Sequence, residues 1–206
     1  MRDSDKIKDA PSVPAGSHGV WGLGVCILFC SLAVRAGAQP ASDQAKEYQV
    51  KIVFVVKFLK FIDWPKTPQE KKDLPFEIAV IGKVPIGEGT KEIPDASVNG
   101  RKVVMTVLHE WKEGDDQEAQ KRLLADCEVL FLARSEETHT DQILPKVIRQ
   151  GVLTVGEAPG FLTQGGIFRF ELEDNKVRFS VDLKNANKAE LTIQSSLLRL
   201  ATQVYK

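Results

Sequence analysis

The sequence has few cysteines and no excess of charge of either sign. Its 206 residues include three cysteines, and Lys and Arg balance Asp and Glu at 28 each. A chain without a net positive charge or a basic cluster lacks the electrostatic surface typical of nucleic-acid-binding proteins. It also lacks the basic cluster that docks proteins on anionic lipid. We therefore expect no nucleic-acid partner.

The common catalytic motifs are also missing. There is no G-x-S-x-G elbow, no Walker A loop, no G-x-G-x-x-G and no H-E-x-x-H. His139 stands among Glu136, Glu137 and Asp141, which suggests either a metal cluster or a solvated acidic helix start, and we favour the second. We predict that the protein is not an enzyme and has no catalytic residue, metal or cofactor.

The N-terminal region contains a short apolar run. Residues 20–34 are apolar or small, too few for the roughly 20 residues of a membrane-spanning helix. Ala36-Gly37-Ala38 follows and fits the small-x-small pattern of a cleavage site. We predict a cleaved signal peptide over residues 1–38 and one domain over residues 39–206, exported to the periplasm. An uncleaved anchor and a later start codon are the alternatives.

Cleavage at that point leaves Cys127 as the one remaining cysteine, because Cys26 and Cys30 lie in the apolar run. A single cysteine cannot form a disulfide within the chain. Cys127 precedes an apolar strand, where a cysteine is usually a small buried hydrophobe. A redox-active Cys127 is the alternative, and it would need exposure and a nearby cation.

Hydrophobic periodicity predicts the elements of an α/β fold. A long helix is expected over residues 41–62, with a core stripe that Val53 and Phe54 widen. Apolar strands at 76–81, 103–108, 129–133 and 152–155 are separated by helical patterns at 113–125 and 141–149. The weakly patterned residues 85–99 suggest at most a short helix. A last helix is expected over residues 197–205.

The chain also carries a hairpin signal, since strands at 167–172 and 176–181 flank Asp174-Asn175. Strands that alternate with helices and end in a hairpin predict a single α/β domain. Its sheet would be mostly parallel, flanked by helices on both faces, with a C-terminal antiparallel hairpin.

Residues 151–170 are the best candidate for a binding surface, because a buried strand there leads into a glycine-rich loop. Phe161 in this loop is either an exposed interface anchor or a side chain that closes the core. Gly165 and Gly166 make the bend into the hairpin. Arg169, beyond this double glycine, could hold an anion or lie on the solvated side of a strand end.

Two further positions are candidates for ligand contact. Arg101 follows the Asn99-Gly100 turn and could also hold an anion at a strand end. Thr192 and Gln194 precede a helix start, where free N–H groups can receive an anion or simply be capped.

Six segments together resemble the YfiR-like family of exported bacterial proteins, and the resemblance covers essentially all of residues 39–206. The segments are residues 47–51 (EYQVK) with 58–65 (FLKFIDWP), 99–103 (NGRKV), 127–132 (CEVLFL), 152–155 (VLTV), 165–168 (GGIF) and 191–201 (LTIQSSLLRLA). Each segment is weakly specific alone, but all six occur in the family's order and spacing.

The resemblance implies a periplasmic α/β protein without catalytic activity. Its best-known member represses a membrane diguanylate cyclase by binding the cyclase's periplasmic sensor domain, which lowers cyclic diguanylate and biofilm formation. We therefore expect the same partner here, or another membrane sensor. The alternative is a periplasmic small-molecule binding domain that feeds a sensor kinase or transporter.

The resemblance also bears on dimerisation, redox control and ligands. The family member is dimeric and redox-responsive, which implies a homodimer and makes Cys127 the matching redox cysteine. A second cysteine pair of the family falls on Phe161 and Phe168 here, so that disulfide is not expected. Small ligands bind family members near the segment matching residues 191–196, but Thr192 and Gln194 replace the basic and imidazole side chains.

Overall fold

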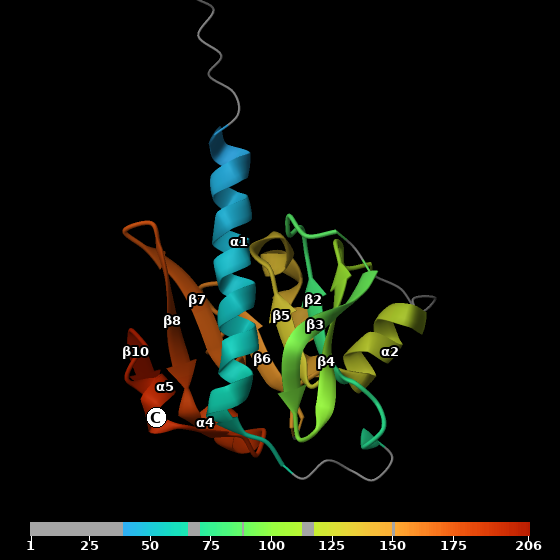
Figure 1. Ribbon diagram of the computed structural model, residues 1–206. Helices are drawn as coiled ribbons and strands as arrows, with labels where there is room; N and C mark the ends of the chain where they lie inside the picture. The colour runs from blue at the N-terminus through green and yellow to red at the C-terminus, as the bar shows by residue number, and fades with distance from the viewer. Residues whose placement is uncertain (1–38, 66–70, 88, 113–117, 150) are drawn as a thin grey trace, which may run out of the picture. The chain divides into compact units, whose positions relative to one another are not determined.

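The computed structural model describes residues 39–65, 71–87, 89–112, 118–149 and 151–206 (Figure 1). The predicted signal peptide, residues 1–38, lies outside the described residues. The rest forms an α/β domain around an eight-stranded sheet, with a second sheet of two short strands. The predicted fold class, a mostly parallel sheet flanked by helices with an antiparallel hairpin, is confirmed.

The large sheet has the strand order β10-β8-β7-β6-β5-β2-β4-β3. In that order the strands are Gln203–Tyr205, Lys176–Asp182, Phe168–Glu173, Leu153–Gly156, Val129–Leu132, Phe76–Ile81, Arg101–Leu108 and Gly89–Val98. Neighbours from β4 to β7 are parallel, as are β10 and β8, whereas β3–β4 and β7–β8 are antiparallel. The strands predicted from residues 76–81, 103–108, 129–133 and 152–155 form the parallel centre.

The helices lie on both faces of this sheet. They are α1 (Gln39–Phe58), α2 (Glu118–Asp126), α3 (Thr140–Ile143), α4 (Leu183–Lys188) and α5 (Ser195–Leu198), with 3-10 turns η1 (Leu59–Phe61), η3 (Arg134–His139) and η4 (Leu144–Lys146). Figure 1 shows α1 crossing one face of the sheet. On that face Phe58 stacks on Phe168, with 4.6 Å between ring centroids. The opposite core contains Leu124 of α2 and Ile143 of α3.

The N-terminal helix ends earlier than predicted. After η1, the chain continues as β1 (Ile62–Asp63), which pairs with β9 (Thr192–Ile193) in the small antiparallel sheet. The pairing with β9 draws Ile62 out of the helix, because strand pairing overrides the local helical pattern. The prediction for Val53 was also wrong, since this side chain is exposed rather than part of the core.

Three other predicted elements differ from the structure. No helix forms near Pro85, where residues 85–87 are irregular, and the edge strand β3 follows from Gly89. The predicted helix at 141–149 is instead the short helix α3 followed by η4, and Pro145 in η4 removes one helical donor. The expected C-terminal helix stops at Leu198, and residues 203–205 add β10 outside the hairpin, so β8 is not an edge strand.

Candidate partner-binding surface

A buried charge cluster fixes α1 to the loop that follows β6. Glu157 comes directly after β6, and its carboxylate accepts hydrogen bonds from the Tyr48 hydroxyl at 3.0 Å and the Arg134 backbone N–H at 2.8 Å. The same carboxylate forms an ion pair with Lys51 of α1, which also pairs with Glu47 one turn earlier. Hydrogen bonds and opposite charge compensate the cost of burying Glu157.

The cluster also shapes the local electrostatics. The Lys51 ammonium lies 4.7 Å from the centre of the Tyr48 ring, a cation–π contact. Burial, followed by the negative charge of Glu157, raises the pKa of the Tyr48 hydroxyl above its ordinary value. Tyr48 therefore stays protonated and donates to Glu157.

Helical periodicity gave no sign that Lys51 is buried, because a lysine at a core position resembles a surface residue in the sequence.

The loop of residues 157–166 is closed by Phe161, which is fully buried. A Cβ placed on Gly156 or Gly166 would approach the Phe161 ring to 2.4 Å and 2.2 Å, so the ring lies directly against both glycines. The interpretation of Phe161 as an exposed interface anchor is therefore wrong, and the side chain closes the core. The loop surrounds this ring and leaves it unavailable to a ligand.

Arg169 and Gly165 also stabilise the conformation of the loop of residues 157–166. The Arg169 Nη1 donates to the carbonyl of Pro159 at 2.6 Å, and its Nη2 lies 2.9 Å from Glu171. Gly165 has a φ of 106°, which favours glycine at this bend. These contacts give Arg169 a structural role within the chain. Its alternative as an anion-binding residue stays a prediction.

Arg101 and Cys127 lie elsewhere, at the amino ends of the parallel strands. Arg101 is buried, and its guanidinium bonds to Glu128 at 2.8 Å, so it already has an anionic partner within the chain. Cys127 is buried, and burial raises the pKa of its thiol to about 11. Both residues line a pocket of about 360 Å³ with Trp64 and Arg149.

Thr192 and Gln194 lie in and beside β9, where both are exposed. The Gln194 amide donates to Asp63 at 3.4 Å, and its backbone N–H donates to Phe61 at 2.9 Å, so this segment holds the end of the first helix. The predicted contact residues thus fall in three separate places. The structure does not bring them together into one site.

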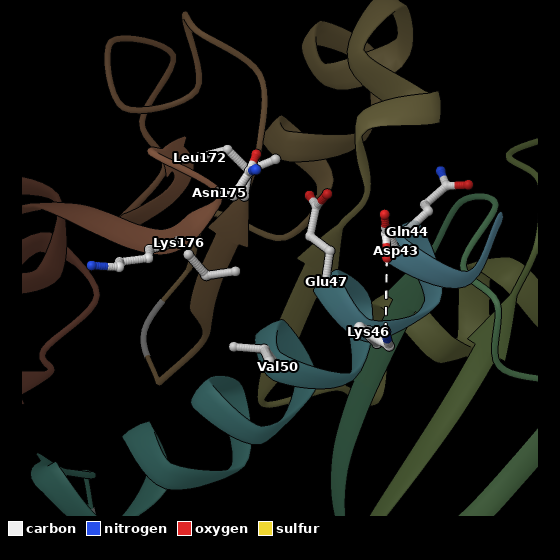
Figure 2. A pocket seen from close by; sticks show the side chains of 9 residues that line it. Asp43, Gln44, Lys46, Glu47, Val50, Leu172, Asn175 and Lys176 are labelled. Atoms are coloured by element: carbon white, nitrogen blue, oxygen red, sulfur yellow. Dashed lines mark ion pairs between the residues drawn. The ribbon is translucent and has the colours of Figure 1, made fainter. Parts of the chain in front are cut away.

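A surface that the sequence did not predict lies between α1 and the β7–β8 hairpin (Figure 2). It contains a hollow of about 800 Å³, with Val50 and Glu47 of α1 on one side and Leu172 and Lys176 of the hairpin on the other (Figure 2). A second hollow of about 450 Å³ continues along α1 past Val50 to Val53. Val50, Val53 and Leu172 are 44%, 51% and 42% exposed.

We call this surface the α1 groove. Its members are Asp43, Gln44, Lys46, Glu47, Gln49, Val50, Val53, Phe54 and Lys57 of α1, and Leu172, Asn175, Lys176 and Val177 of the hairpin. The hairpin side is fixed by a tight turn, in which Asp174 and Asn175 have φ values of 49° and 57°. Residues that tolerate positive φ favour such two-residue hairpin turns.

Metal sites and membrane spans are both absent from the part of the chain that the structure describes. No cluster of three or more His, Cys, Asp or Glu side chains there could hold a metal ion. His139 contacts Glu136, with 3.0 Å between Nδ1 and Oε2, in a pair rather than a larger cluster. None of the helices in the same ranges combines the length and the apolar character needed to cross a bilayer.

Comparison with known proteins gives one family. The model of the YfiR/HmsC-like family matches residues 48–202. No curated protein matches the chain. Among solved structures, the chain is similar to a conserved domain protein from Vibrio cholerae, with 10% identity and a TM-score of 0.49. That alignment covers 76% of this chain and 59% of the Vibrio chain, so this chain spans less than two thirds of that structure.

Proposed function

This chain belongs to the YfiR/HmsC-like family, and from that premise we propose that it is a regulatory binding protein of the periplasm. It inhibits a membrane-bound diguanylate cyclase by binding the periplasmic sensor domain of that enzyme. The result is less cyclic diguanylate and less biofilm. The observation that carries the proposal is the extent of the family match, which runs from α1 to the residue before β10.

Inhibition of this kind requires only that the protein prefer one state of its partner. A ligand shifts a two-state equilibrium by its difference in affinity for the two states, and a few kcal/mol shifts it by orders of magnitude. Residues 1–38 carry the export signal in this proposal. A homodimer is compatible with it and stays a prediction.

The test is genetic and uses the bacterium that makes the protein. Deleting the gene should raise intracellular cyclic diguanylate, and restoring the full chain should lower it again. A chain that starts at Gln39, and so lacks residues 1–38, should accumulate in the cytoplasm and fail to restore the low level. An unchanged cyclic diguanylate level after deletion would overturn the proposal.

A second candidate function rests on the pocket at the amino ends of the strands. Its volume of about 360 Å³ falls in the range of small-ligand sites. The indole of Trp64 and the guanidinium of Arg149 offer stacking and charge to a small organic anion. A thermal shift screen with amino acids and nucleotides tests this function, because a ligand that binds only the folded state raises the melting temperature. Loss of the shift in Arg149→Gln would place the ligand in this pocket.

A further inference from the structure

The α1 groove exposes aliphatic side chains that do not serve the fold. Val50 and Val53 lie one turn apart on α1 and are about half exposed, at 44% and 51%. Valine is a poorer helix former than alanine, leucine, lysine or glutamate, so these positions gain nothing for helix stability. Leu172 of β7 and the half-buried Val177 of β8 line the larger hollow together with Val50. An apolar strip next to a hollow is typical of a surface that another molecule covers.

Lysines lie along this strip. Lys46 and Lys57 are exposed on α1, one turn before Val50 and one turn after Val53. Within the described ranges, Lys57 has no ion pair. Lys46 has a partner in Asp43 at 3.8 Å, but both side chains are more than 70% exposed, so the pair is weak. Along α1, an exposed lysine therefore lies on either side of the apolar centre.

This charge pattern disfavours a second copy of the chain as the occupant. If two α1 helices paired antiparallel with their valines in contact, Lys46 of each copy would face Lys57 of the other. A parallel pairing would place each lysine beside its own counterpart. The antiparallel alignment also brings Asp43 opposite Lys60, but Lys60 lies in η1, beyond the end of α1. The like charges next to the apolar contact oppose both pairings.

The shape of the surface disfavours a membrane. The surface is concave between helix and hairpin, as Figure 2 shows, and a bilayer cannot enter such a hollow. A narrow segment of a protein can.

We propose that the α1 groove binds an acidic amphipathic helix of a partner protein. Aliphatic side chains of that helix rest on Val50, Val53 and Leu172. Its carboxylates, placed one turn to either side, pair with Lys46 and Lys57. This is helix-in-groove recognition, in which anchors at i, i+3 or i+4 and i+7 enter an apolar groove. The inference rests on the proposed function, because it names the surface through which a protein partner is bound.

The groove is rigid before the partner arrives. The ion pair between Lys51 and Glu157 fixes α1 to the loop after β6, and the stack of Phe58 on Phe168 fixes its C-terminal end. A preformed surface avoids the cost of ordering helix and hairpin on binding. The partner helix therefore meets a template whose apolar centre and lysines are already placed.

Two synthetic peptides test the groove directly. Each is a helical peptide of about 15 residues with leucines at helical spacing; one carries glutamates beside the leucines, the other lysines at the same positions. Fluorescence anisotropy with residues 39–206 should show binding of the glutamate peptide only. Lys57→Glu should weaken this binding about tenfold, because an attraction becomes a repulsion, and should gain binding of the lysine peptide.

Lys184→Glu is the matched control, because Lys184 is an exposed helical lysine of α4 outside the groove. It should bind the glutamate peptide as wild type does. Equal binding of both peptides, or no effect of Lys57→Glu, would overturn the inference. Binding to vesicles of anionic phospholipid without binding of the glutamate peptide would overturn it too, in favour of a membrane.

An experiment in the bacterium separates this inference from the proposed function. In a deletion strain with raised cyclic diguanylate, a Val53→Glu chain should fail to restore the low level, whereas Lys184→Glu should restore it. Full restoration by Val53→Glu would overturn the groove and leave the regulatory function standing. If deletion itself has no effect, the regulatory function fails, and the peptides still decide the groove. Thermal unfolding of Val53→Glu should match wild type, since Val53 is exposed.

Discussion

Lys51 of α1 and Glu157 of the loop after β6 form an ion pair whose side chains are both 1% exposed. They lie 106 residues apart in the chain, so the pair joins the N-terminal helix to the carboxyl end of a central strand. The pair connects the helix that carries the α1 groove to the loop around Phe161. Its removal should therefore affect both stability and partner binding.

Lys51→Met should destabilise the protein by about 3 to 5 kcal/mol, because it leaves the Glu157 carboxylate buried without its cation. The double variant Lys51→Met/Glu157→Gln should recover part of that loss, since no charge then stays unpaired. Urea unfolding followed by circular dichroism measures both. Lys57→Met is the matched control on the exposed side of the same helix and should change stability by less than about 0.5 kcal/mol. Equal stability of Lys51→Met and Lys57→Met would contradict the assigned role of the pair.

Gly166→Ala should destabilise the protein by about 1 to 3 kcal/mol, as overpacking does elsewhere. The added Cβ would lie 2.2 Å from the Phe161 ring and 2.8 Å from the Phe161 carbonyl oxygen, so the loop must move. Gly160→Ala in the same loop is the control. Its Cβ would meet the end of the flexible Gln164 side chain at 3.2 Å and the Thr163 hydroxyl at 3.8 Å, and a smaller effect is expected.

A third variant tests whether the Phe161 ring is the cause. Phe161→Ala should itself cost about 3 to 5 kcal/mol. In that background Gly166→Ala should cost much less than in wild type, because the clashing ring is gone, and residues in contact are not additive. Full additivity of the two changes in denaturant unfolding would show that Gly166 is constrained by something other than Phe161.

The sequence could predict the parallel centre of the sheet and the hairpin, because their signals are local. Residues 129–132, for example, are apolar throughout, which indicates a buried strand. The Asp174-Asn175 pair indicates a hairpin turn from its residue types alone. The wrong end of the first helix has its cause in a tertiary contact. Ile62 continues the helical pattern and leaves the helix to pair with Ile193, which lies 131 residues away.

The candidate surface shows the same limit at the level of single side chains. Lys51 looks like a surface residue and is buried, whereas Val53 looks like core and is exposed. Periodicity alone places both wrongly, because the face of α1 that meets the sheet is decided by partners such as Glu157. A buried lysine can be found in a sequence only when its distant carboxylate is known.

Cys127 should be unreactive in the folded protein. Its thiol is buried and its pKa is raised to about 11, so the reactive thiolate is scarce at neutral pH. In residues 39–206, a chromogenic disulfide reagent at pH 8 should label no cysteine until denaturant unfolds the chain, and then one. Rapid labelling of the native protein would restore the interpretation of Cys127 as a redox-active residue.

The same pKa predicts how stability depends on alkaline pH. The folded pKa of Cys127 is raised from 9.0 to about 11, mainly by burial, so its contribution is fully present below pH 9. It is lost as pH rises toward 11, because the unfolded chain releases the proton first. Two pKa units correspond to about 2 to 3 kcal/mol. The raised pKa of Tyr48 adds a loss of the same sign that begins above pH 10.

The difference between wild type and Cys127→Ala isolates the thiol. Both proteins share Tyr48 and the lysines, so only the wild type should show the extra decline in unfolding free energy between pH 9 and 11. Measurements of urea unfolding at several pH values give that difference directly. Parallel pH profiles for the two proteins would show that the Cys127 thiol titrates alike in the folded and unfolded states.

Arg101→Lys should destabilise the protein although the charge is kept. The Arg101 Nε donates to the Leu74 carbonyl at 2.8 Å, while Nη2 reaches Glu128 at 2.8 Å, a fork that an ammonium group cannot reproduce. Loss of one such buried, charge-assisted bond costs about 1 to 3 kcal/mol. Lys102→Met is the control next to it, because Lys102 is exposed and its pair with Glu92 contributes less than about 1 kcal/mol. If Arg101→Lys and Lys102→Met unfold at the same urea concentration, the guanidinium fork does not stabilise this end of the sheet.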